Sequence, residues 1–199
     1  MIITIGRQHG SNGHLIAAGL AERLSYRCLD KEIVDHAAEN SQFNREILAS
    51  YDEKRISLYV TGSPHYFGMG EGFRLSNQIA AAQFEAIRSL AEKGNEIFVG
   101  RCADYVLRHR ADLLRVFIMA PLDYRIRVLM ERKGIGEEQA RKLARQVDKD
   151  RSSFYRYYTD QTWGEMENYD LCINSACLSV EEAVDTIAAI VLSKDQRIG

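Results

Sequence analysis

The sequence predicts a doubly wound α/β domain, in which a parallel sheet of five strands is flanked by helices. Short β-branched runs alternate with long amphipathic stretches, which is the pattern of strands joined by helical crossovers. The chain has 199 residues, 46% of them hydrophobic, which fits a single domain with a sizeable buried core. Ligands of such domains bind beyond the carboxyl ends of the strands, so the loops at that edge are the first candidates for a site.

Each element has a local signal. β-branched and aromatic runs predict strands over residues 2–5, 27–29, 96–99, 114–119 and 171–173. Apolar residues at helical spacing predict helices over residues 14–24, 31–39, 75–90, 121–133, 137–158 and 180–191. Pro121 fits a first helical turn, Gly134 a helix stop, and Ser179 with Glu182 a capping box. Residues 42–72 are less regular, and glycines around Pro64 predict a loop there.

Composition excludes several classes of protein. The 26 basic and 28 acidic residues give a net charge of −2, so no overall field attracts nucleic acid or an anionic membrane. Apolar runs reach only about five residues, whereas a membrane span needs roughly 20. The start, Met1–Ile5, lacks the basic region of a signal peptide. The cysteines show no paired spacing and are expected to be small buried hydrophobes in a reducing compartment. We therefore expect a cytoplasmic globular protein without a nucleic-acid or membrane partner, and the oligomeric state stays open.

The loop after the first strand is the strongest candidate site. It reads Gly6-Arg7-Gln8-His9-Gly10-Ser11-Asn12-Gly13-His14, and the next helix follows at once. Small residues let backbone N–H groups turn inward, and the helix adds its positive end, so a phosphate is favoured. An ordinary glycine-rich turn explains the spacing equally well. The Walker pattern is not matched, because Gly13 stands where lysine is expected and Leu15 near the position of the magnesium-binding Ser or Thr.

The same loop, read as residues 3–13, resembles the opening of the cytidylate kinase-like family, a branch of the nucleoside monophosphate kinases. Three further segments, residues 29–32, 99–105 and 148–175, are similar to that family in the same order. The resemblance covers nearly the whole chain and is weakest over residues 40–90. It implies a P-loop kinase fold as a single domain over residues 1–199, with a substrate-binding helical insertion at about 35–93 and a mobile lid at about 134–164. Ordinary cytidylate kinases carry the loop lysine that this chain lacks.

The resemblance also implies roles for individual residues. The donor nucleotide, ATP with Mg²⁺, would be bound by Arg7 and residues 9–14 (His9, Gly10, Ser11, Asn12, Gly13 and His14), with Asn174 beside the adenine. Arg101 would hold the α-phosphate of a small phosphate-bearing acceptor and Asp104 its base. Asp30 would approach the acceptor or the water shell of the metal. Arg151 and Arg145 would neutralise the transferring group as catalytic residues.

Each of these residues also has a plainer explanation. Residues 141–158 hold six basic side chains, which suits a solvated helix face. Asp30 serves equally as a helix N-cap, and Asp104 as a favourable charge near a helix start. Arg101 suits a surface ion pair, and Asn174 a strand end. His9 and His14 lack metal-ligand spacing, so no metal site built from protein ligands alone is predicted.

Three functions follow from the sequence. The first is ATP-dependent phosphoryl transfer to a nucleoside monophosphate, with CMP or dCMP favoured. The second is a catalytically impaired nucleotide-binding regulatory protein on the same fold, for which the missing lysine is the evidence. The third is a small-molecule kinase with another acceptor, because residues 40–90 match the family least.

Overall fold

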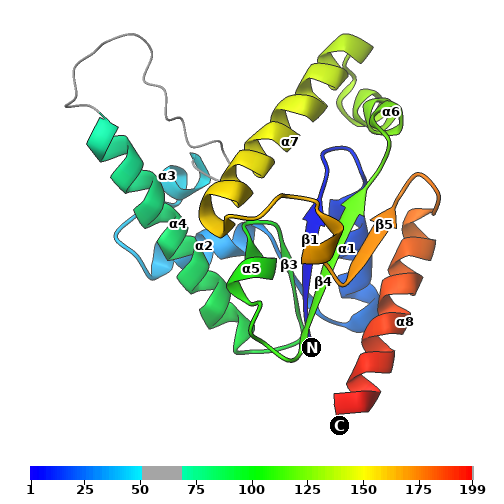
Figure 1. Ribbon diagram of the computed structural model, residues 1–199, viewed down its shortest axis with the longest axis horizontal. Coiled ribbons are helices and arrows are strands. Elements are labelled where there is room, and N and C mark those ends of the chain that lie inside the picture. The colour runs from blue at the N-terminus through cyan, green and yellow to red at the C-terminus, as the bar shows by residue number, and fades with distance from the viewer. Residues whose placement is uncertain (51–68, 199) are drawn as a thin grey trace.

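The computed structural model describes residues 1–50 and 69–198 and shows one sheet with helices on both faces (Figure 1). The five strands are all parallel, in the order β2-β3-β1-β4-β5. Their bounds are Ile2–Arg7 (β1), Arg27–Leu29 (β2), Glu96–Val99 (β3), Leu113–Met119 (β4) and Leu171–Asn174 (β5). The predicted parallel α/β class is confirmed.

The six predicted helices form. Most ends lie within one residue of the prediction, but α4 begins at Met69 rather than residue 75, and α8 continues to Ile198 rather than ending near residue 191. The bounds are Gly13–Leu24 (α1), Lys31–Glu39 (α2), Arg45–Ser50 (α3), Met69–Ala91 (α4), Ala103–Val106 (α5), Leu122–Lys133 (α6), Glu137–Thr159 (α7) and Val180–Ile198 (α8), with a 3-10 turn at Met166–Asn168. The α3 and α5 helices were not predicted, because four to six residues are too few to show a helical period. The predicted loop around Pro64 lies outside the described residues, except for its last four positions. For residues 69–72 the loop prediction is wrong, because they form the first turn of α4 despite two glycines.

Two helix ends form as the sequence predicts. The N–H of Glu182 donates to Ser179 Oγ at 3.1 Å, and the N–H of Ser179 donates to a carboxylate oxygen of Glu182 at 2.7 Å, which is a capping box. Gly134 ends α6 in a left-handed conformation with φ 63°. Gly134 therefore turns the chain between α6 and α7, which pack against each other above the sheet (Figure 1).

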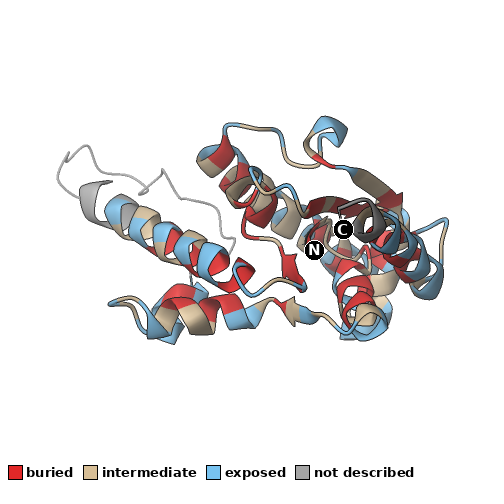
Figure 2. Cartoon of the chain, turned by 90° about the horizontal axis from the view of Figure 1, so that it is seen from below, coloured by how far each residue is buried: buried red, intermediate tan, exposed pale blue. Residues whose placement is uncertain are grey.

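The core lies on both faces of the sheet. On one face Ile3 and Ile5 pack against α1 and α8, and on the other Ile2 and Phe98 pack against α2, α4 and α5. Figure 2 shows the buried residues running along the strands and the inner sides of these helices. This alternation along β1 leaves its last residues, Gly6 and Arg7, to lead out of the core toward the loop.

The cysteines depart from the prediction. Cys102 alone is buried among the four, Cys28 and Cys172 are half-buried, and Cys177 is exposed. The expectation that all four are buried is wrong, because Cys177 follows the end of β5 rather than lying in it. No helix in the described part of the chain is long and apolar enough to cross a membrane.

Candidate functional site

The sheet order brings three loops together at one edge. Because β1 lies between β3 and β4, the chain segments after all three strands meet there. The N–H of Gln8 donates to the carbonyl of Ile118 at 3.0 Å, and Gln8 Oε1 accepts the N–H of Ala120 at 3.0 Å. On the other side, the N–H of Gly100 donates to the carbonyl of Ile5 at 3.1 Å. The loop after β1 therefore has a neighbouring strand end on each side.

Close packing explains two of the loop glycines. A Cβ at Gly10, whose φ is 85°, would lie 2.8 Å from the carbonyl oxygen of Arg125. A Cβ at Gly13 would lie 2.5 Å from Cβ of Arg7. The side chain of Arg7 thus occupies the space that a side chain at position 13 would need, so a lysine there has no room in this arrangement.

Two of the loop N–H groups already have partners within the protein. The N–H of His9 donates to Asp148 Oδ1 at 2.8 Å, and the N–H of Ser11 donates to the carbonyl of Gln8 at 3.3 Å. The fully buried hydroxyl of Ser11 contacts the carbonyls of Gln8 and Ile118 instead of the cleft. The prediction that all N–H groups of residues 9–14 face an anion is therefore narrowed, for the described chain, to those of Gly10, Asn12, Gly13 and His14.

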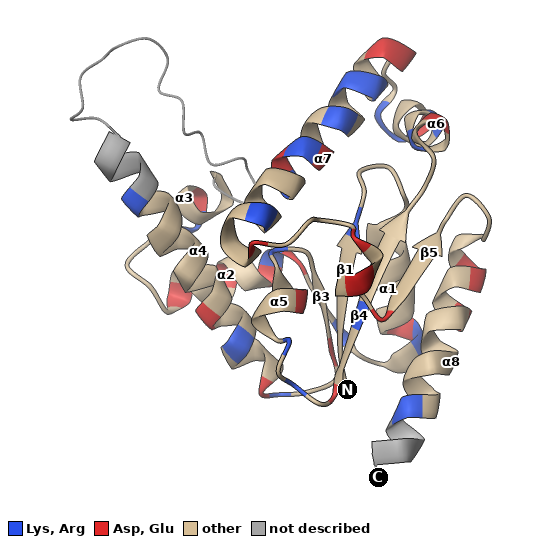
Figure 3. Cartoon of the chain, viewed as in Figure 1, with Lys and Arg blue, Asp and Glu red and all other residues tan. Residues whose placement is uncertain are grey.

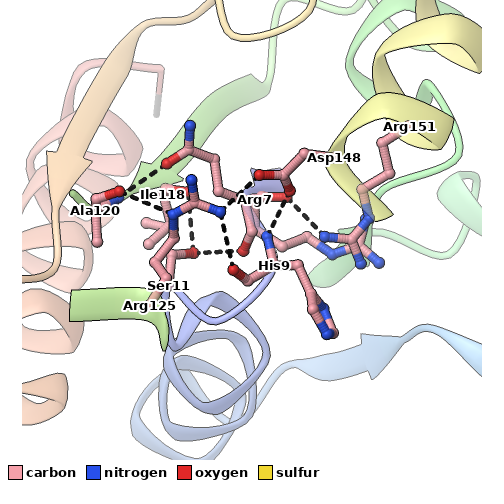
Figure 4. A network of polar contacts seen from close by, with 9 residues as sticks. Arg7, His9, Ser11, Ile118, Ala120, Arg125, Asp148 and Arg151 are labelled. Atoms are coloured by element: carbon pink, nitrogen blue, oxygen red, sulfur yellow. Dashed lines mark hydrogen bonds and ion pairs between the residues drawn. The ribbon is translucent and has the colours of Figure 1, made fainter. Parts of the chain in front are cut away.

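An ion pair from the two long helices above the sheet holds this loop (Figure 4). Arg125 of α6 is 7% exposed and donates to the carbonyl of His9 at 3.1 Å, to Asp148 at 2.6 Å and to the carbonyl of Ala120 at 2.9 Å. Neither partner was singled out for this role from the sequence. Arg125 lies on an ordinary amphipathic helix, and nothing in the chain order shows that Asp148 of α7 faces it.

A large cleft of about 670 Å³ opens beside the loop. Basic side chains from four elements or their flanks line it: Arg7, Lys31, Arg132, Lys133 and Arg151. Asp30 is the carboxylate among the lining residues, and His9 and His14 also face the cleft. Figure 3 shows basic bands along α7, the helix that reaches over this edge of the sheet. A cleft of this size and charge suits a polyphosphate.

A second cavity adjoins the first and shares Asn12 and Arg132 with it. It has about 280 Å³ and is otherwise lined by Tyr124, Arg127 and neighbouring residues of α6. Asn12, in the left-handed conformation with φ 61°, donates to Tyr124 Oη at 3.0 Å and accepts a hydrogen bond from Arg132. A ligand in the large cleft can therefore extend along α6.

A small pocket of about 20 Å³ lies on the other side of Arg7 and Arg151. Its lining includes Arg101, Asp104 and Trp163, and both Arg7 and Arg151 line this pocket as well as the large cleft. Arg151 Nη1 donates to the carbonyl of Arg7 at 2.9 Å. This hydrogen bond holds the guanidinium of Arg151 against the end of β1. The volume holds little more than one water molecule, so a larger ligand requires the lining to move.

The backbone that carries Arg101 is unusual. Gly100, Arg101 and Cys102 all have φ between 54° and 77°, a region that costs non-glycine residues roughly 1–2 kcal/mol each. Arg101 is 2% exposed and donates from Nη1 to Asp30 Oδ1 at 2.8 Å and to the carbonyl of Val99 at 3.2 Å. His14 Nδ1 lies 3.4 Å from the other oxygen of Asp30. Strained backbone of this kind is concentrated at functional sites, and here it turns a buried guanidinium toward the small pocket.

Asp104 is buried in the same pocket. It is 8% exposed, and Tyr155 Oη donates to its Oδ2 at 2.7 Å. Burial raises the pKa of Asp104 to about 6, and the hydrogen bond from Tyr155 opposes part of that rise. Asp104 can therefore exchange a proton near neutral pH, unlike an exposed aspartate.

Not every predicted site residue lines one of these cavities. Arg145 is exposed on α7 and lines none of these cavities within the described residues. Asn174 Oδ1 accepts the N–H of Ala176 at 3.1 Å and is likewise absent from the cavity linings. Conversely, Arg132 and Lys133 line the large cleft although the sequence analysis did not select them. Their position at the end of a helix, just before Gly134, was the available signal.

Comparison with known proteins agrees with this architecture. A family model described as the cytidylate kinase-like family matches residues 2–176. The chain belongs to the cytidylate kinase-like family. The match includes the loop after β1, the strained turn at Arg101 and all of α7, so every cavity described above lies within the family's part of the chain.

Individual relatives are distant. A cytidylate kinase of Methanothrix thermoacetophila is 29% identical over 178 residues, covering 88% of each chain. Among solved structures, an uncharacterized protein from Eubacterium ventriosum has a TM-score of 0.74 at 29% identity, covering 97% of this chain and 98% of its own. A shikimate kinase from Bacteroides thetaiotaomicron has a TM-score of 0.57 at 14% identity, covering 96% of this chain and 98% of its own, and shows a shared fold. The fold of this family member is thus the P-loop kinase fold.

Proposed function

We propose that the protein transfers the γ-phosphoryl group of ATP to a nucleoside monophosphate, with CMP or dCMP as the preferred acceptor. The observation that carries this proposal is that Arg7 and Arg151 line both the large cleft and the small pocket. A group passing from one compartment to the other passes two guanidinium groups. Phosphoryl transfer depends mainly on positioning and on neutralising the transferring charge, which is what such a boundary supplies.

The donor polyphosphate belongs in the large cleft. Among the described residues, the N–H groups of Gly10, Asn12, Gly13 and His14 donate no hydrogen bond within the loop. They lie at the start of α1, where the helix stabilises an anion. The adjoining cavity along α6 suits the donor base, because it shares Asn12 and Arg132 with the cleft. This placement competes with the one suggested beside Asn174.

Mg²⁺ keeps several waters and binds through phosphates and one or two carboxylates. Asp30 fits that need, because it lines the large cleft while Arg101 and His14 hold its carboxylate in place. Leu15, near the position of the usual Ser or Thr ligand, is 44% exposed and has no oxygen to offer. Mg²⁺ would reduce the repulsion between phosphate charges when bound with the donor.

The acceptor belongs on the side of Arg101 and Asp104. A buried guanidinium is suited to hold a phosphate by paired N–H groups, and a carboxyl group that takes up a proton near neutral pH is suited to the edge of a pyrimidine. Because the pocket has only about 20 Å³, acceptor binding must displace aromatic lining such as Trp163. Small hydroxyl compounds are the alternative acceptors. They would receive the same phosphoryl group from ATP, but they would make different contacts with this pocket.

The test is a transfer assay with Mg-ATP and a panel of CMP, dCMP, UMP, AMP, GMP and small hydroxyl acceptors, with products identified by mass spectrometry. We expect CDP or dCDP to form fastest, and ADP without acceptor to form slowly. Faster phosphorylation of another member of the panel would overturn the proposal that CMP or dCMP is the preferred acceptor. ATP binding without transfer to any acceptor would overturn the proposed kinase activity and favour a regulatory nucleotide-binding protein.

The lone tryptophan gives a second, independent readout of acceptor binding. Trp163 lines the small pocket and packs edge-on against Phe117, with ring centroids 5.3 Å apart. We expect CMP to change its fluorescence and the change to be lost in Arg101→Met. Arg88→Met, an exposed arginine on α4, is the matched control. A response of equal size and affinity in Arg101→Met would move the acceptor elsewhere.

A further inference from the structure

His9 lies in the loop after β1, and its side chain has no role in the proposed function. Its backbone is fixed on both sides, because its N–H donates to Asp148 and its carbonyl accepts from Arg125. Its ring lines the large cleft, and Nε2 is buried without a hydrogen-bond partner among the described residues. Buried polar atoms nearly always have a partner, so this nitrogen calls for a group that the protein itself does not supply.

Charges from three elements surround the ring. Arg7 ends β1, Arg125 and Lys133 belong to α6, and Arg151 belongs to α7. The nearby carboxylate of Asp148 is already bound by Arg125 and by the His9 N–H. On the far side of the cleft, the start of α1 and α2 brings His14, Asp30 and Lys31. Burial and the four cations lower the pKa of His9 to about 4, so the free ring is neutral at pH 7.

A polyphosphate in the cleft would reverse this balance. Its negative charges would lie among the same cations and offset their repulsion of a proton on the ring. A protonated ring donates from both nitrogens, and a charged donor to a phosphate oxygen forms one of the stronger hydrogen bonds. The ring would therefore gain a proton and its missing partner in the same event.

The geometry at position 13 makes such a cation useful. Because the side chain of Arg7 fills the space beside Gly13, the loop cannot carry its usual lysine there. We propose that His9 binds the donor polyphosphate and takes up a proton as it does so, so that the loop acquires its own cation only when the anion is present. This inference rests on the proposed function for the identity of the donor, but it requires only anion binding and no turnover.

The direct test is ¹⁵N NMR of the histidine rings in the wild-type protein at about pH 6, with and without saturating ATP. We expect one ring, absent from the spectrum of His9→Asn, to change from a neutral to an imidazolium pattern on binding. A His9 ring that stays neutral with the cleft saturated would overturn the proposal. The change in protonation is observed in the wild type, and the variant serves only to assign the ring.

Calorimetry gives the matching thermodynamic test. ATP binding is measured in two buffers of different ionisation enthalpy, and proton uptake by the wild type is compared with that of His9→Asn at the same pH, so that titration of ATP itself cancels. We expect wild-type affinity to fall by up to about tenfold for each pH unit above 6, and this slope to be shallower in His9→Asn. His109→Asn, an exposed histidine, is the matched control and keeps the wild-type slope. Equal proton uptake in the wild type and His9→Asn would overturn the inference.

The two proposals fail separately. Proton uptake at His9 without phosphoryl transfer to any acceptor would leave this inference standing and remove the proposed enzyme. Transfer to CMP with a ring that stays neutral would do the reverse.

Discussion

Asp148 of α7 and Arg125 of α6 bind the backbone N–H and the backbone carbonyl of the same residue, His9. Asp148 accepts its N–H at 2.8 Å, Arg125 donates to its carbonyl at 3.1 Å, and the two side chains pair at 2.6 Å. The loop that faces the large cleft is therefore attached to the helices above it through a closed ring of hydrogen bonds (Figure 4). Movement of α7 away from the sheet must break this ring.

The first prediction concerns that ring. Asp148→Asn removes the charge facing Arg125, whose side chain is 8% exposed, and leaves a nearly buried cation without its carboxylate. We expect the free energy of unfolding to fall by about 2–4 kcal/mol, as measured by urea denaturation. Asp150→Asn is the matched control, since Asp150 lies on the same helix and accepts hydrogen bonds from the side chain of Gln146 rather than from a buried arginine. Equal losses in the two variants would show that the ring adds no stability.

The second prediction tests the space at position 13. Gly13→Ala places a methyl group 2.5 Å from Cβ of Arg7, and neither atom is the flexible end of a side chain. We expect a loss of about 1–3 kcal/mol in the free energy of unfolding together with weaker ATP binding. Gly136→Ala is the control, because a Cβ there meets nothing within 4 Å, and its cost should stay below about 1 kcal/mol. Gly13→Lys should be no better than Gly13→Ala, and a gain in ATP affinity would contradict this packing.

The sequence predicted the sheet and the long helices because their signals are local. Ile2–Ile5 and Ile97–Val99 are apolar runs, and Gly134 and the Ser179–Glu182 pair mark helix ends within a few residues. The sequence analysis selected the loop, Arg101 and Arg151 because each follows a strand or resembles a family motif, and all three line the cavities at the sheet edge. Arg125 was missed because its role depends on Asp148, which lies 23 positions away along the chain, and on the angle between two helices. No local pattern encodes that meeting.

The third prediction concerns Arg151 and assumes the proposed function. Because its guanidinium lies at the boundary between the two compartments, Arg151→Ala should lower kcat far more than it weakens ATP binding. Loss of one charge-assisted contact worth roughly 3 kcal/mol corresponds to about hundredfold slower turnover. Lys142→Ala, an exposed residue on the same helix, should leave kcat unchanged. An unchanged kcat in a folded Arg151→Ala preparation would make Arg151 a structural residue that only holds the end of β1.

The last prediction concerns two residues, Asp104 and His9, whose contributions to stability change with pH in opposite directions. Asp104 has an ordinary pKa of 3.8 and a folded value of about 6, so between these values the folded protein keeps a proton that the unfolded chain loses. Its contribution to stability is therefore lost as the pH rises from about 4 to 6. His9 has an ordinary pKa of 6.5 and a folded value of about 4, so in that range the unfolded chain binds a proton that the folded protein refuses. Its contribution is lost as the pH falls.

Because the two windows overlap, the effects offset each other in the wild type and become visible only in variants. Asp104→Asn should make stability rise more steeply between pH 4 and 6 than in the wild type, by up to roughly 3 kcal/mol over the window. His9→Asn should make it rise less or fall, by a smaller amount, since the ring is only partly buried and solvent screens it. The measurement is the free energy of urea unfolding at several pH values, with each variant compared with the wild type at the same pH. Above about pH 7 both difference curves should become flat, because neither group then exchanges a proton on unfolding. A variant curve parallel to the wild type through the whole range would show that the residue titrates alike in the folded and unfolded chains.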